Sequence, residues 1–97
     1  MDTKNKQEKP KWFKGAWYTQ GDIVKNPFSG AKCLISGPEL SMYDFIKGAE
    51  YTLAVNAQNS GDFYIEDPAM VKLQEEMIKG IDWFRETNLT AYMTLLD

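Results

Sequence analysis

Residues 36–57 read SGPELSMYDFIKGAEYTLAVNA and carry the strongest fold signal in the 97-residue chain. Ser36 and Glu39 have capping-box spacing, and Pro38 suits the first turn of a helix. Apolar residues then recur at steps of three and four and form one stripe: Met42, Ile46, Ala49, Leu53 and Ala57. This periodicity predicts a long amphipathic helix that ends in the polar run 56–61.

A second long helix is predicted after Asp67, which can cap it, with Pro68 in the first helical position. One face is lined by Met70, Leu73, Met77, Ile81 and Phe84. Asn88 either ends this helix or caps a short third one over residues 89–96, with Tyr92, Met93 and Leu96 pointing inward. Residues 63–65, between the two long helices, are expected to insert into the core.

Two glycines interrupt the helical patterns. Gly48 and Gly80 lie in the middle of the two long helices, where glycine costs about 1 kcal/mol relative to alanine. We expect each to allow close packing against a neighbouring helix or ring.

A β-hairpin is predicted before the first helix. Asn26-Pro27-Phe28-Ser29-Gly30 is a turn sequence, with Pro27 suited to the second turn position and Gly30 to a positive φ. It separates the short strand-like runs 23–25 and 32–34, which are expected to pair, and residues 17–18 could add a third strand. A two-stranded hairpin is marginal in water, so it should pack on the helices. Cys33 is expected to be a small core residue.

The predicted fold class is therefore α+β, mainly α. Two long antiparallel helices and a short C-terminal helix carry a small β-hairpin packed on one side. Residues 1–11 are polar and lysine-rich and are expected to form a flexible basic arm. Residues 12–97 are expected to form a single domain.

The absence of histidine excludes several functions. The chain has no histidine and one cysteine, Cys33, so Ser-His-Asp and Cys-His catalysis and His-ligated zinc are impossible. A single cysteine cannot form an internal disulfide, which indicates a reducing compartment. The sequence shows no secretory signal and no run of about 20 apolar residues. These observations predict a cytoplasmic protein without a membrane span.

Carboxylates are the remaining candidates for acid–base or metal chemistry. Asp82 and Glu86 share a helix face, and Glu75 lies near Lys79 in the same helix, a pattern typical of a solvated charged surface. No calcium-binding loop or phosphate-binding loop is present. No cofactor, metal site or catalytic residue is predicted, and an enzyme using carboxylates with a divalent cation is the least favoured function.

Aromatic residues are abundant for so small a domain: five Phe, five Tyr and three Trp. A small domain has limited space to enclose them, so some are expected to contact another subunit. The predicted contact residues come from the aromatic segment 12–18 and the turn: Trp12, Phe13, Trp17, Tyr18 and Phe28.

Nucleic-acid binding is the alternative interpretation of the same segment. Lys9, Lys11 and Lys14 are interleaved with aromatic residues, and such lysines can contact phosphates while rings stack on bases. Residues 1–14 carry a net charge of +3, whereas residues 15–97 carry −6. Because an acidic body repels nucleic acid, protein contact is the favoured interpretation.

Two stretches resemble a known group of proteins. Residues 21–30 (GDIVKNPFSG) with 40–50 (LSMYDFIKGAE), and residues 80–88 (GIDWFRETN) with 91–97 (AYMTLLD), are similar to small uncharacterised proteins of marine, cyanophage-type tailed bacteriophages. That family has no assigned activity, so the resemblance implies an origin and a host-cytoplasm location but no catalytic residues.

Together these observations favour a non-enzymatic protein–protein interaction or assembly module. We expect it to be homo-oligomeric and to serve phage assembly or to modulate a host protein.

Overall fold

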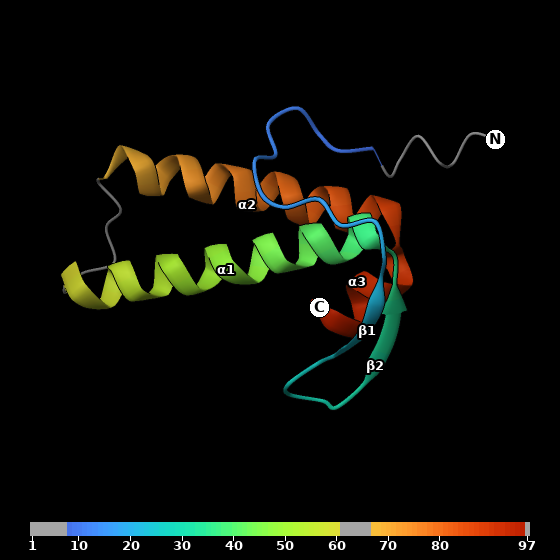
Figure 1. Ribbon diagram of the computed structural model, residues 1–97. Coiled ribbons are helices and arrows are strands. Elements are labelled where there is room, and N and C mark those ends of the chain that lie inside the picture. The colour runs from blue at the N-terminus through green and yellow to red at the C-terminus, as the bar shows by residue number, and fades with distance from the viewer. Residues whose placement is uncertain (1–7, 61–66, 97) are drawn as a thin grey trace.

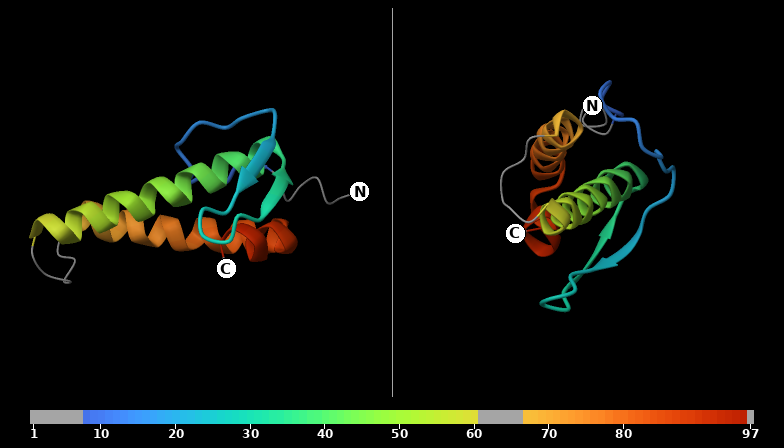
Figure 2. Two further views of the ribbon diagram at one scale, coloured as in Figure 1. Left: turned by 90° about the horizontal axis from the view of Figure 1, so that it is seen from below. Right: turned by 90° about the vertical axis from the view of Figure 1, so that its left-hand side faces the viewer.

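Three helices and one β-hairpin make up the computed structural model, which describes residues 8–60 and 67–96 (Figure 1). In chain order the elements are β1 (Asp22–Lys25), β2 (Lys32–Ile35), α1 (Gly37–Ser60), α2 (Pro68–Thr87) and α3 (Leu89–Leu95). α1 and α2 lie side by side in antiparallel directions, and the hairpin projects from the start of α1 on the side away from α2 (Figures 1 and 2). The predicted mainly helical α+β fold is confirmed.

The predicted helix caps are present. At the start of α1, the Glu39 N–H donates to Ser36 Oγ at 3.2 Å and the Ser36 N–H donates to Glu39 Oε1 at 2.9 Å. Asp67 accepts from the Ala69 N–H at 2.9 Å, and Asn88 accepts from the Ala91 N–H at 3.1 Å. Local sequence therefore fixes where each helix begins, because these side chains satisfy backbone donors that the first turn leaves unpaired.

The hairpin is antiparallel and has the predicted turn. Its register pairs Asp22 with Ile35 and Lys25 with Lys32, and Gly30 has a φ of 80°. Residues 17–18 do not join the sheet, which has only two strands in the described part of the chain. The backbone N–H of Tyr18 instead donates to Ser41 Oγ at 2.7 Å, so this segment is fastened to α1 by a side chain.

The buried core lies at one end of the molecule, where the hairpin, α3 and the aromatic segment meet the two long helices. Its fully enclosed residues come from every described element except β1, together with the N-terminal segment: Phe13, Ile35, Met42, Tyr43, Ile46, Ala49, Phe84, Ala91 and Leu95. Cys33 is half-buried against this cluster, as expected for a small core residue.

The third helix has a different buried face from the predicted one. Tyr92 and Leu96 are half-buried against the core, but Met93 is 57% exposed, and Ala91 and Leu95 are the enclosed residues. Ala91 and Leu95 are one helical turn apart, whereas Met93 lies about 200° around the axis from Ala91. The inner face of α3 is therefore defined by residues 91 and 95.

The two mid-helix glycines differ in their surroundings. A Cβ on Gly80 would lie 3.0 Å from Met42 Sδ and 3.4 Å from Ile46 Cγ1, so the predicted close packing is confirmed there. Gly48 is exposed, and a Cβ on it would meet no atom within 4 Å. The predicted packing role of Gly48 is wrong, because no described residue packs against this position of α1.

Two predictions concern segments outside the described residues. One is the insertion of residues 63–65 into the core, and the other is the flexible basic arm over its residues 1–7. Of the arm, residues 8–11 are described: they lie beside the C-terminal part of α2, and the Phe13 N–H donates to the Pro10 carbonyl at 3.1 Å.

Candidate partner-binding surfaces

Most of the aromatic residues predicted to contact a partner instead make contacts within their own chain. Phe13 is 3% exposed, and its ring centroid lies 5.2 Å from that of Trp17 and 5.5 Å from that of Phe45. Trp12 and Trp17 are half-buried around it, and the Trp17 ring packs on Trp83 at 5.9 Å. This aromatic cluster joins the N-terminal segment to α1 through Phe45 and to α2 through Trp83.

Tyr18 is exposed but has an intramolecular partner. Its phenol donates to Asp44 Oδ2 at 3.1 Å. This hydrogen bond, the negative charge of Asp44 and a small loss of hydration raise the pKa of Tyr18 above its ordinary value. Phe28 alone among the five predicted contact residues is almost fully exposed, at 95%.

The three predicted nucleic-acid-contact lysines are exposed. Lys9 and Lys11 line an open groove of about 680 Å³ whose other lining residues include Trp83 and Glu86, and Lys14 does not line it. The structure therefore brings only two of the three together, and it places two acidic side chains, Glu8 and Glu86, beside them. A phosphate entering this groove would meet both signs of charge.

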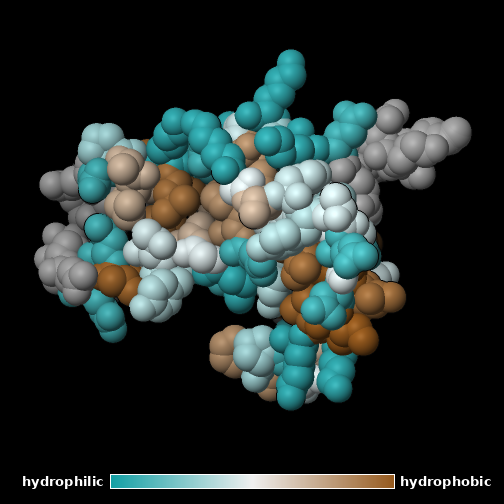
Figure 3. Space-filling model, in the orientation of Figure 1, coloured by the Kyte–Doolittle hydropathy of each residue, from teal (hydrophilic) through white to brown (hydrophobic). Residues whose placement is uncertain are grey.

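In the half of the helical pair away from the core, none of the residues whose burial is described is buried. Between Glu50 and Gln58 on α1, and between Asp67 and Lys79 on α2, every described side chain is half-buried or exposed. The apolar stripes of the two helices continue through this half, where Leu53 and Ala57 on α1 and Met70 and Leu73 on α2 are only half-buried. We call these four residues the distal seam. Figure 3 shows apolar surface between the two helices at this end of the molecule.

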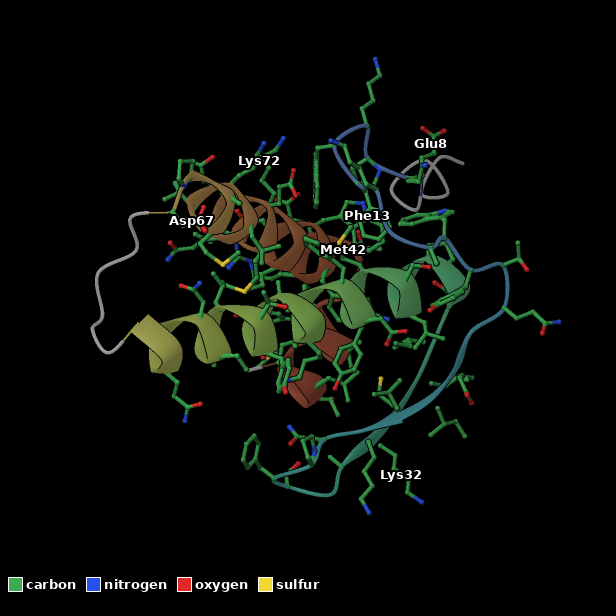
Figure 4. All side chains as sticks on the ribbon, turned by 60° about the vertical axis from the view of Figure 1, so that its left-hand side comes forward. Glu8, Phe13, Lys32, Met42, Asp67 and Lys72 are labelled. Carbon is green, nitrogen blue, oxygen red and sulfur yellow. The ribbon has the colours of Figure 1, made fainter. Side chains whose placement is uncertain are left out.

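Acidic residues flank the distal seam. Glu50 is one turn before Leu53 on α1 and pairs with Lys47 at 3.1 Å. Glu76 is one turn after Leu73 on α2. Lys72 lies on the other side of α2 and projects away from α1 (Figure 4).

A second apolar surface lies on the hairpin. Ile23 is 61% exposed and Leu34 is 73% exposed, and the two residues are directly opposite each other in the register. Phe28 of this hairpin is among the residues predicted from the sequence to contact a partner, whereas Ile23 and Leu34 are not. The missed signal is that β1 and β2 each carry apolar residues at consecutive positions, so one of each pair must face outward.

No group of three or more Cys, Asp or Glu side chains within residues 8–60 and 67–96 is arranged to hold a metal ion. Within the same ranges, no helix is both long and apolar enough to span a bilayer. Comparison of the chain with protein-family models, curated proteins and solved structures finds no match.

Proposed function

We propose that this chain is a non-enzymatic assembly module that forms homo-oligomers by docking the distal seams of two copies. The observation that carries the proposal is the uneven distribution of the core. All fully enclosed apolar side chains lie at one end of the helical pair, and the four seam residues at the other end remain half-open to water. Two helices without a third layer leave an apolar stripe uncovered, and packing against another pair of helices covers it.

The geometry of such an assembly follows from helix packing. Two antiparallel helical pairs that meet through apolar stripes form a four-helix bundle with crossing angles of about 20°. Leu53 and Ala57 are one turn apart on α1, as are Met70 and Leu73 on α2. Each pair therefore offers one ridge to the neighbouring copy.

The size of the seam indicates weak association. Completing the burial of a half-exposed aliphatic side chain contributes about 1 kcal/mol, so the seams of two copies together contribute on the order of 6–8 kcal/mol. Association itself costs about 4–15 kcal/mol. These terms nearly balance, so we expect an equilibrium between monomer and dimer that depends on concentration.

The biological setting is part of the same proposal. The resemblance of residues 21–50 and 80–97 to phage proteins supports a role in the cytoplasm of a bacterial host, in phage assembly or in modulation of a host protein. A protein without histidine, and with its one cysteine half-buried against the core, offers few groups for catalysis, which supports a binding role.

Sedimentation analysis from micromolar to millimolar concentration tests the proposal. The wild-type protein should show an average mass that rises toward that of a dimer. Leu73→Ser in the seam should shift this transition to higher concentration, while Leu89→Ser, a matched change at an exposed leucine on α3, should not. A strictly monomeric wild-type protein, or equal effects of the two substitutions, would contradict the proposal.

A further inference from the structure

The outer face of the hairpin combines an apolar pair with a basic pair. Ile23 lies opposite Leu34, and Lys25 lies opposite Lys32. Side chains two positions apart on a strand point to the same face, so these four residues share one surface, which we call the hairpin face. The alternate residues Val24, Cys33 and Ile35 pack toward the core. Figure 3 shows the apolar part of the hairpin next to its basic end, and Figure 4 shows Lys32 projecting away from the helices.

The hydrogen-bonding pattern brings these paired side chains close together. The Asn26 N–H donates to the carbonyl of Ala31, its opposite residue, at 2.8 Å. Because bonded and non-bonded pairs alternate along an antiparallel ladder, Lys25–Lys32 and Ile23–Leu34 are non-hydrogen-bonded pairs, whose Cα atoms lie about 4.5 Å apart. Two lysines opposite each other at this spacing repel, and neither has an ion pair within the described residues.

The tip of the hairpin is held in a defined conformation. Asn26 Oδ1 accepts from the backbone N–H groups of Phe28 at 2.8 Å and Ser29 at 3.2 Å. The Asn26 Nδ2 group also donates to the Thr94 carbonyl at 2.9 Å, which fastens the turn to α3. The exposed Phe28 ring is therefore carried on an anchored turn, and ordering it on binding costs less conformational entropy.

We propose that the hairpin face binds an acidic, apolar segment of another protein. Carboxylates of such a segment would neutralise Lys25 and Lys32, while its aliphatic side chains would cover Ile23 and Leu34. The lysine pair without ion partners is the reason for proposing an acidic segment. Its two positive charges would be complemented by carboxylates, and the neighbouring aliphatic side chains by aliphatic side chains of the segment. The proposal concerns a second surface and does not depend on the distal seam.

Other occupants fit this surface less well. Face-to-face docking of a second copy would bring two lysine pairs together, and like charges across an interface are repulsive. Addition of a strand to the edge of β1 is hindered because the Ile23 N–H already donates to Asp22 Oδ1 at 2.7 Å. Nucleic acid would gain little from the aliphatic pair, since bases stack on flat rings.

Binding of defined probes to the full-length protein tests this proposal. The probe is a labelled synthetic peptide of alternating leucine and glutamate, and the control peptide has lysine in place of glutamate. The acidic peptide should bind saturably and should shift the amide resonances of residues 23–34. The double substitution Lys25→Glu with Lys32→Glu should weaken this binding by roughly tenfold or more. Lys79→Glu, at an exposed lysine of α2, should leave it unchanged.

Three outcomes would overturn the inference. The first is an absence of saturable binding to the acidic peptide, and the second is equal binding of the lysine peptide. The third is stronger binding to vesicles of phosphatidylglycerol with phosphatidylcholine, or to oligothymidine, than to the acidic peptide. Circular dichroism of the double variant checks that it folds. Sedimentation of the Leu73→Ser variant tests the distal seam separately, so failure of one proposal is distinguishable from failure of the other.

Discussion

Asn26 and Thr94 are 68 positions apart in the sequence and are joined by a hydrogen bond of 2.9 Å from the Asn26 side-chain amide to the Thr94 carbonyl. The same asparagine side chain accepts from two backbone groups of the turn, and it is buried, with 9% exposure. One polar side chain therefore sets both the shape of the turn and the position of the hairpin on α3.

Asn26→Ala should destabilise the fold by about 1–3 kcal/mol, because it leaves buried polar groups without their partner. Thermal unfolding measures this change, since 1 kcal/mol shifts the midpoint by about 4–8 °C in a domain of this size. Ser29→Ala is the control: its hydroxyl accepts from the Ala31 N–H on an exposed surface, so its effect should stay within about 0.5 kcal/mol. Equal midpoints for the two variants would show that the Asn26 anchor is not formed.

Alanine at the two mid-helix glycines should have opposite effects. Gly48→Ala should stabilise the protein by about 0.5–1 kcal/mol, because its Cβ meets no neighbour and glycine is a poor helix former. Gly80→Ala should destabilise it, because its Cβ would press on the enclosed side chains of Met42 and Ile46. Urea unfolding of both variants gives the sign of each change. Stabilisation by both would mean that α1 and α2 do not approach closely at Gly80.

Alanine substitutions at Phe13 and Phe28 should affect different properties, stability in the first case and binding in the second. Phe13→Ala should cost about 3–5 kcal/mol, because the ring is enclosed within its own chain. Phe28→Ala should change the free energy of unfolding by less than about 0.5 kcal/mol but should weaken binding of the acidic peptide to the hairpin. Chemical denaturation and peptide titration measure the two effects. A stable Phe13→Ala variant would contradict the intramolecular aromatic cluster.

The Tyr18–Asp44 hydrogen bond predicts a dependence on alkaline pH. The pKa of Tyr18 is raised in the folded state, so the folded state holds this phenol proton more tightly than the unfolded state does. Its contribution to stability is present below the unfolded pKa of about 10 and is lost as the pH rises through the folded pKa. NMR titration of the Tyr18 ring should show a lower pKa in the Asp44→Asn variant. An unchanged pKa would show that the phenol does not meet this carboxylate.

Features determined by neighbouring residues could be predicted from the sequence. The capping pairs, the turn at Asn26–Gly30 and the apolar stripes of both long helices depend on spacings of two to four positions, and each is present. Which aromatic side chains are buried within the chain is harder to predict, because an aromatic residue gives the same sequence pattern whether it packs in its own chain or against another. Phe13 and Phe28 illustrate the ambiguity: one is enclosed and the other is exposed.

Features that depend on tertiary placement could not be predicted from local patterns. Gly48 and Gly80 occupy similar positions in their helices, yet within residues 8–60 and 67–96 only Gly80 has a side chain packed against it, since the helices meet on one face. The distal seam has the same apolar periodicity as the buried half of the helices. It is left open because the hairpin, α3 and the aromatic segment all pack at the other end, which helical periodicity does not reveal.

Intermolecular NOEs between differently isotope-labelled copies give the most direct test of the distal seam. An equal mixture at millimolar concentration should show cross-peaks between the methyl groups of Leu53 or Leu73 in one copy and those of Met70 or Leu73 in the other. Sedimentation of the same sample establishes whether it is associated. Two results would contradict the account. One is a sample that remains monomeric, and the other is an associated sample whose intermolecular cross-peaks come only from the hairpin or α3.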